Sequence, residues 1–154
     1  CAKKYCNHIM NTAIADLNKL LANMTRTLNE GAYAYSNVPL ADSSTTLSQI
    51  PSDALSGSFR EAEGMTLILS EAAAHACNQP ILFRAAWISL TVHSDLAAVG
   101  LTAAFAHALG AAQISCNVIA AAFHDHIFVP MEEAQRAMQV LQQLQHDALM
   151  HNKP

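Results

Sequence analysis

The segment Thr91–Met131 constrains the fold more than any other part of the chain, because helical and strand-like apolar patterns alternate within it. Ser94 or Asp95 is expected to cap a helix, since both side chains accept hydrogen bonds from free backbone N–H groups. The expected elements are a strand at 87–92, a helix ending near 109, strands at 114–122 and 127–129, and a helix starting at Pro130. This order predicts an α+β, ferredoxin-like fold of βαββαβ units.

In such a fold, helices cover one face of an antiparallel sheet. The even positions of strand 87–92 are aliphatic, whereas its odd positions hold Trp87, Ser89 and Thr91. The aliphatic positions are expected to pack beneath the helices. The other face carries Trp87, Ile119 and tyrosines, and it needs a cover. Either a second copy of the chain, giving a homodimer, or close packing of the two halves of one chain would supply that cover.

The first half of the chain repeats part of this order. Strand, turn, strand and a helix with an acidic start occur at residues 59–73 and again at 123–134. A loop at 39–56, with one helical turn at most, replaces the first helix of the earlier half. The other elements expected there are a helix at 12–28, a strand at 32–38, a hairpin at 58–60 and 65–69, and a helix at 71–77 capped by Ser70.

The repeat predicts a division of the chain into two related halves with short ends. We expect an extension at 1–17, a degenerate N-terminal half at 18–84, a C-terminal half at 85–146 and a tail at 147–154. A chain of 154 residues is long enough for one compact domain or for two very small ones that share a core.

Composition and charge exclude several classes of function. Hydrophobic residues make up 52% of the chain, and the formal net charge is −4. Without a run of lysine and arginine, the chain lacks the positive surface that nucleic-acid binding requires. No segment has the roughly 18 uncharged apolar residues of a membrane span, so no membrane partner is expected.

The motifs of common enzymes and metal modules are missing as well. The four cysteines (Cys1, Cys6, Cys77 and Cys116) form no CxxC pair and match no zinc module. Cys77 and Cys116 are expected to be buried reduced thiols, which favours a cytoplasmic location. The chain has no GxSxG motif and, with five glycines, no Gly-rich phosphate loop. We therefore expect neither catalytic activity nor a cofactor.

Six motifs spread over roughly residues 18–145 point to a known family. They are Gly31–Tyr35, Phe59–Thr66, Thr91–Ser94, Ala98–Ala104, Ile114–Ile119 and His124–Val129. Together they resemble ACT domains, small regulatory modules that usually bind amino acids, and in particular small bacterial stand-alone proteins with tandem ACT domains. The resemblance implies two ACT units and a regulatory role with an amino acid as the ligand.

A candidate ligand site lies where the strand ending at Val92 meets the next helix. Free N–H groups at the helix start favour a carboxylate, Asp95 can accept from an ammonium group, and the Asn117 amide both donates and accepts. In ACT domains this loop and the adjacent strand commonly line the effector site. The resemblance thus assigns ligand binding to His93, Ser94, Asp95, Leu96, Val99, Gly100, Asn117, Val118 and Ile119. The alternative is structural, with capping residues at the helix start and Gly100 allowing close helix–sheet packing.

Three histidines form a weaker candidate site, for a metal ion. His124 and His126 are two residues apart, and the predicted topology brings His93 to the same edge of the sheet. Three neutral imidazoles can bind Zn²⁺. The alternatives are a polar hairpin whose histidines bond to the backbone or to Asp125, and a pH-sensitive cluster.

The turn of the first hairpin combines Arg60 with Glu61 and Glu63. Arg60 is a candidate for binding a carboxylate across an interface. We expect these three residues, with His124 and His126, to lie at an interface or at the rim of the ligand site. The alternative is a solvated hairpin tip in which Arg60 pairs with a neighbouring glutamate. A protein-interaction module without a ligand is the second functional hypothesis.

Overall fold

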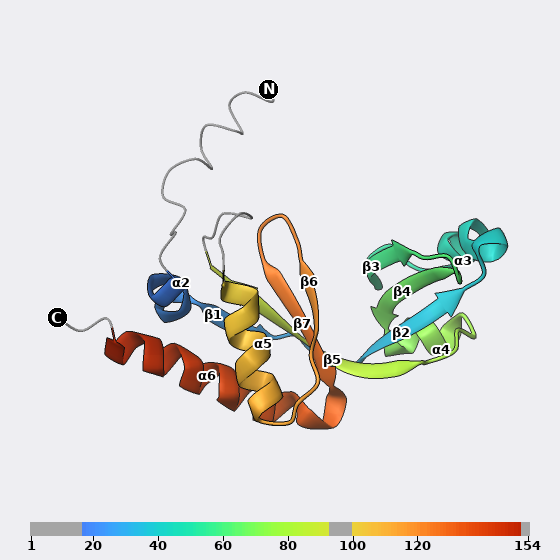
Figure 1. Ribbon diagram of the computed structural model, residues 1–154. Coiled ribbons are helices and arrows are strands. Elements are labelled where there is room, and N and C mark those ends of the chain that lie inside the picture. Colours follow the sequence, from blue (N-terminus) through green and yellow to red (C-terminus); the bar gives the residue numbers. More distant parts are fainter. Residues whose placement is uncertain (1–16, 93–99, 152–154) are drawn as a thin grey trace, which may run out of the picture.

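The computed structural model describes residues 17–92 and 100–151, and its strands form one sheet flanked by helices (Figure 1). The strands are β1 (Thr25–Leu28), β2 (Tyr33–Val38), β3 (Leu55–Arg60), β4 (Met65–Ser70), β5 (Phe83–Thr91), β6 (Asn117–Ala120) and β7 (Asp125–Pro130). The helices are α2 (Leu17–Asn23), α3 (Ser43–Gln49), α4 (Glu71–Ala76), α5 (Leu101–Ala111) and α6 (Ala134–His151), with 3-10 turns η1 (Leu40–Asp42) and η2 (Met131–Glu133). None of the helices within the described ranges is long and apolar enough to cross a membrane.

Strand β5 belongs to both halves of the sheet, because its two ends pair with different strands. Near its start Ala85 pairs with Tyr33 of β2, and near its end Thr91 pairs with Thr25 of β1. The strand order is β3-β4-β2-β5-β7-β6, with β1 beside β5, and all six pairings are antiparallel. The N-terminal unit therefore has the order β5-β2-β4-β3, and the C-terminal unit has the order β1-β5-β7-β6. Both are the ferredoxin-like order, which confirms the predicted α+β class and the two ACT-like halves.

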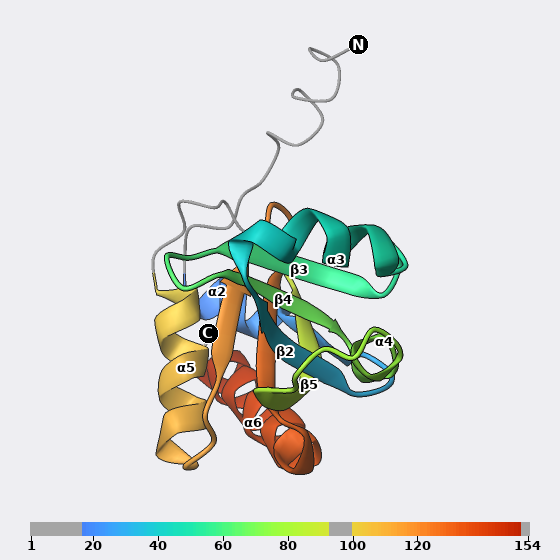
Figure 2. The same ribbon diagram turned by 90° about the vertical axis from the view of Figure 1, so that its right-hand side faces the viewer.

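Figure 1 shows how the helices are shared between these units. Helices α2, α5 and α6 lie around the C-terminal unit, whereas α3 and α4 lie beside the N-terminal unit. Figure 2 shows the same grouping from the side, with α5 and α6 away from α3 and α4. The shared strand β5 runs from one group to the other, so the two units form one continuous body.

The start of the described chain differs from the single helix predicted at 12–28. Helix α2 ends at Asn23, and the residues from Thr25 onward form β1. Thr25 and Thr27 are β-branched and favour an extended backbone. Pairing with β5 then supplies hydrogen bonds that a short helix end would lack. The helical spacing of apolar residues extends past Asn23 in the sequence because Leu28, which lies in β1, also packs into the core.

Three further elements differ in extent from their predictions. The connection predicted as a loop at 39–56 contains η1, the helix α3 and the first residues of β3. The strand predicted at 114–122 is shorter, because only Asn117–Ala120 pairs with β7. Pro130 ends β7, where it pairs with Ala85, and helix α6 begins only after η2. Proline has no N–H to donate, and this position opposite β5 does not require one.

Helix α4 starts where the sequence predicts. The Ser70 hydroxyl accepts a hydrogen bond from the backbone N–H of Ala73 at 3.3 Å, which makes Ser70 the N-cap. Glu71 then forms a two-point ion pair with Arg84 of β5, with N–O distances of 2.5 and 3.1 Å. The hydrogen bond from Arg84 lowers the pKa of the Glu71 carboxyl. Because the pair is at the surface, its contribution to stability is small, but it fixes α4 against the sheet.

The two hairpins have the same register, which confirms the internal repeat. Phe59 pairs with Thr66 in the hairpin β3–β4, and Ile119 pairs with His126 in the hairpin β6–β7. Strands β4 and β7 also share one burial pattern, with three consecutive buried residues in the middle. Thr66 in the N-terminal unit therefore corresponds to His126 in the C-terminal unit.

The turns of the two hairpins match as well. The Glu61 N–H donates to the Gly64 carbonyl at 2.8 Å, and the Ala121 N–H donates to the His124 carbonyl at 3.0 Å. Glu61 thus corresponds to Ala121, and the acidic side chain of the first turn has no counterpart in the second.

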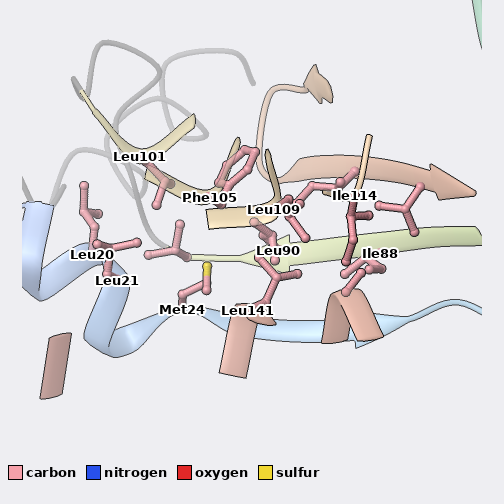
Figure 3. Close-up of a cluster of buried hydrophobic side chains, with 14 of the residues drawn as sticks. Leu20, Leu21, Met24, Ile88, Leu90, Leu101, Phe105, Leu109, Ile114 and Leu141 are labelled. Atoms are coloured by element: carbon pink, nitrogen blue, oxygen red, sulfur yellow. The ribbon is translucent and has the colours of Figure 1, made fainter. Parts of the chain in front are cut away.

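The larger hydrophobic core lies between the C-terminal half of the sheet and α2, α5 and α6 (Figure 3). Phe105 and Leu109 of α5 and Leu141 of α6 are fully buried there with Ile88 and Leu90 of β5. This confirms that the even positions of β5 face the helices. A smaller core lies between the N-terminal half of the sheet and its two helices.

The predicted boundary between residues 84 and 85 falls within β5, and the division into domains stays a prediction. The structure groups α2 and β1 with the C-terminal unit, since β1 pairs with β5 and Leu20 and Leu21 of α2 join the core that contains Leu141. The units are therefore interleaved along the sequence, and the C-terminal unit contains residues from both ends of the described chain.

Candidate functional site

The face of the sheet that the helices leave uncovered carries a distinct set of side chains. Successive strand residues point to opposite faces, so partners across the registers share a face. We call this face, away from both helix-covered cores, the open face. Its central side chains are those of Tyr33, Tyr35, Phe83, Ala85, Trp87, Ser89, Asn117, Ile119, His126 and Phe128.

Aromatic rings fill the centre of the open face, where the two units meet. Trp87 of β5 stacks on Phe128 of β7, with ring centroids 5.8 Å apart and an interplanar angle of 20°. Tyr33 of β2 and Trp87 form a T-shaped pair, with ring centroids 5.1 Å apart. Tyr35 contacts both Phe83 and Phe128 at 5.8 and 5.5 Å. These contacts join β2 of one unit to β7 of the other, so the aromatic cluster fixes the units against each other.

The ionisation of Tyr35 provides a test of this cluster. Burial raises the pKa of Tyr35 to about 12, and burial also raises the pKa of Tyr33. The unfolded chain loses its tyrosine protons near pH 10. The stabilisation from protonated Tyr35 is therefore complete below about pH 10 and is lost as the pH rises towards 12. An alkaline titration of tyrosinate absorbance should show Tyr35 ionising last, and Tyr35→Phe should remove that last step. If the step remains in Tyr35→Phe but disappears in Tyr33→Phe, the assignment is wrong.

A chain of hydrogen bonds crosses the open face of the C-terminal unit beside these rings. The Asn29 amide donates to the Ser89 hydroxyl at 2.9 Å and to the Trp87 carbonyl at 3.1 Å. The Trp87 indole N–H donates to His126 Nδ1 at 3.0 Å, and Ser89 Oγ lies 3.1 Å from the same nitrogen. Three strands, β5, β7 and the extension of β1, therefore hold the His126 ring in one orientation.

These contacts also define the protonation state of His126. An indole N–H can only donate, so Nδ1 must accept, and the neutral ring carries its proton on Nε2. Burial lowers the pKa of His126 and the charge of His124 lowers it further, against the opposite effect of Asp125. Burial raises the pKa of Asp125, whose side chain points towards the helix-covered face, while His126 and His124 act in the other direction. At neutral pH the open face thus presents a neutral imidazole with an outward N–H donor.

The structure describes four of the nine residues that are predicted to bind a ligand. His93, Ser94, Asp95, Leu96 and Val99 lie outside the described residues. Gly100 is the N-cap of α5 with φ of 100°, and an added Cβ would lie 3.2 Å from the Leu17 side chain. Asn117 and Ile119 lie on the open face, whereas Val118 packs against the helix-covered core. The three β6 residues therefore cannot line one pocket together, and ligand binding by this set stays a prediction.

The histidines of the second hairpin do not complete a metal site within the described part of the chain. The rings of His124 and His126 are 6.4 Å apart between centroids. No group of three possible ligands was found among residues 17–92 and 100–151. His93, the third member of the predicted set, lies outside these ranges. His126 is bonded to the side chains of Trp87 and Ser89 on β5, and not to the backbone or Asp125 as the polar-hairpin alternative expects.

The acidic turn of the first hairpin is a solvated tip, but without the predicted pairing of Arg60 with a neighbouring glutamate. Arg60, Glu61 and Glu63 are all exposed. Glu61 accepts a hydrogen bond from the Thr66 hydroxyl of its own hairpin. Among the described residues, the two ion pairs are Arg84–Glu71 and Arg136–Glu133, so Arg60 does not pair with a neighbouring glutamate. A role for Arg60, Glu61 and Glu63 at an interface stays a prediction.

The two described cysteines are free and half-buried rather than fully buried. Burial raises the pKa of the Cys116 thiol, which disfavours the thiolate that nucleophilic catalysis needs. This geometry agrees with a structural role for Cys116.

Sequence reasoning missed Asn29 and Ser89, which hold His126 in place. Ser89 was assigned to the correct face but to no site. Asn29 follows β1, and this strand was not predicted because residues 12–28 were expected to form one helix. The alternating threonines Thr25 and Thr27 could have indicated the strand that Asn29 follows.

Comparison with known proteins agrees with the fold. A sequence model of an ACT domain matches residues 12–86, and a second ACT-domain model matches residues 83–143. The crystal structure of a Vibrio cholerae protein of unknown function, described as a possible transport protein, is 43% identical, with a TM-score of 0.73 over 84% of this chain and 95% of that one. The chain belongs to the ACT-domain family.

More distant structures share the fold alone. The ligand-free regulatory subunit of aspartate kinase from Thermus thermophilus is 11% identical, with a TM-score of 0.61 over 77% of this chain and 95% of that chain. The aspartate kinase of Clostridium acetobutylicum is 10% identical, with a TM-score of 0.56 over 80% of this chain and 34% of that enzyme. A search of the curated proteins found no match.

Proposed function

We propose that this chain is a regulatory protein that binds a small molecule, with an amino acid as the ligand class. The observation that carries the proposal is the presence of two complete ACT units that share β5. ACT domains are regulatory modules, and a structure with the same fold is a regulatory subunit of aspartate kinase. The proposed contact region is the connection between β5 and α5 together with strand β6, which contains the residues predicted from 93 to 119.

Thermal unfolding of the full chain with each amino acid tests this proposal. A ligand that binds only the native state stabilises it by about 2.7 kcal/mol at a concentration of 100 times Kd. One amino acid, or a small related group, should raise the Tm, and Asn117→Ala should reduce that rise more than a substitution of the exposed Gln142 of α6, Gln142→Ala, does. If no amino acid at millimolar concentration changes the Tm, an amino-acid sensor is excluded.

We also propose that the protein is a homodimer in the cytoplasm without catalytic activity of its own. The support for a dimer is a set of large apolar side chains that the fold leaves exposed, with Phe59, Leu82 and Phe123 each about two-thirds exposed or more at 71%, 68% and 67%. Light scattering after size exclusion should give twice the mass of one chain. A single-chain mass at all concentrations would refute the dimer.

A protein-interaction module without a small ligand is the second candidate, and the same exposed side chains favour it. The two candidates differ in the thermal experiment. A dimer whose Tm no amino acid changes would support the interaction module.

A further inference from the structure

The outward N–H of His126 is a prepared hydrogen-bond donor on the open face. Asn29 donates to Ser89, and both Ser89 and the Trp87 indole lie at hydrogen-bond distance from Nδ1. The contacts to the ring are thus made at Nδ1, on the side that faces Trp87 and Ser89 of β5. The described residues offer no partner to Nε2, which therefore points its proton away from the network. A ring fixed in this way can bind an acceptor without losing further conformational freedom.

The surroundings of this donor favour a negatively charged acceptor with an apolar portion. Ile119 lies directly opposite His126 in the register, and Asn117 lies diagonally across from it on the same face. Ile119 is 37% exposed, and the Asn117 amide is exposed. The open-face positions of β1, β5, β6 and β7 carry no acidic side chain. Two donors and an apolar wall are thus available without a competing internal carboxylate.

The N-terminal unit shows what occupies the corresponding place there. Thr66 corresponds to His126, and its hydroxyl donates to the carboxylate of Glu61. Glu61 corresponds to Ala121, which has no polar side chain. The first unit therefore holds a carboxylate of its own beside this strand position, whereas the second unit has a donor and no internal carboxylate.

We propose that the Nε2–H of His126 and the amide of Asn117 bind the carboxylate of a small ligand on the open face, next to Ile119 and Trp87. This inference rests on the proposed function, since it places the carboxylate of the amino-acid ligand. The ligand carboxylate takes the place that Glu61 occupies in the N-terminal unit. Because the Trp87 indole orients the His126 ring, a change in the hydrogen bond of the indole also changes the site.

Two substitutions test the site in the full chain. His126→Asn keeps a short side-chain acceptor for the Trp87 indole but removes the Nε2–H, so it should weaken binding of the active amino acid roughly tenfold or more. Ala121→Glu supplies the internal carboxylate that Glu61 supplies in the other unit, and it should compete with the ligand and weaken binding to a similar degree. Ala122→Glu adds the same charge to the next residue of the turn and is the matched control with near-normal binding.

Trp87 is the only tryptophan, so its fluorescence and its indole N–H resonance report on the site directly. The active amino acid should change both signals, and its carboxamide analogue should not. If an amino acid raises the Tm but binds His126→Asn and Ala121→Glu as tightly as the unmodified chain, the proposed function stands and this site is refuted. If no amino acid raises the Tm, acetate is the probe. An unchanged Trp87 indole and an unchanged His126 ring in saturating acetate would also refute the site.

Discussion

Replacing Phe105 with alanine is expected to lower the free energy of unfolding by about 3–5 kcal/mol. Phe105 has an exposed fraction of 0%. It lies on α5 within the larger core, where side chains from α2, α6 and the sheet converge (Figure 3). The loss combines the transfer of a phenyl ring to water with the cavity that rigid neighbours leave behind. Urea unfolding followed by circular dichroism measures it.

Phe59→Ala is the matched control, because it removes the same atoms from a side chain that is 71% exposed. Its effect should stay within about 0.5 kcal/mol, as for other surface substitutions. Equal losses for the two variants would mean that Phe59 is buried in solution, as it would be in a stable dimer. A small loss for Phe105→Ala would show that the larger core is not packed as described.

The second large effect is expected from Gly64→Ala, with a loss of about 2–5 kcal/mol. Gly64 is buried in the turn of the first hairpin with φ of 155°. A Cβ there would lie 2.4 Å from Asn37 Oδ1 and 2.6 Å from the Val38 carbonyl oxygen. The asparagine side chain can move away, but the backbone carbonyl cannot do so without displacing the end of β2. The same unfolding measurement applies.

Gly110→Ala provides the control for this glycine, because a Cβ at Gly110 meets no atom within 4 Å. Gly110 lies in α5 and is exposed. Alanine favours a helix over glycine by about 0.5–1 kcal/mol, so this variant should be more stable than the original chain. Unchanged stability of Gly64→Ala would show that the turn is open enough to accept a side chain.

Local patterns predicted most of the fold because its elements agree with their own residue preferences. The alternation in β5, the Ser70 cap and the two hairpins depend on neighbouring residues only. The helix predicted at 12–28 failed at β1, because a short strand is stabilised by its partner, and that partner lies far along the chain. The helix α3 was missed because its serines and threonines resemble a loop.

The candidate site was less predictable, because it depends on contacts between distant residues. The end of β5 and the second hairpin do lie at the same end of the sheet, since Leu90 pairs with Asp125, whereas His93 lies outside the described residues. Periodicity also showed that Trp87 and Ser89 share a face. The sequence did not show that Asn29 is hydrogen-bonded to Ser89, or that the indole N–H of Trp87 donates to Nδ1 of His126. Hydrogen bonds of this kind have no spacing signal, since their partners come from β5, β7 and the residue that follows β1.

The pairing of β1 with the far end of β5 has a consequence for synthesis of the chain. The apolar residues Leu20, Leu21 and Met24 leave the ribosome early, but the core that buries them needs β5, α5 and α6, which are made later. The N-terminal unit can form most of its sheet before that time, whereas the C-terminal unit cannot close until α6 has emerged. Contacts between residues so far apart in sequence slow folding and prolong exposure of apolar surface. The interleaved order of the two units thus leaves the apolar side of α2 uncovered until the later strands and helices have been made.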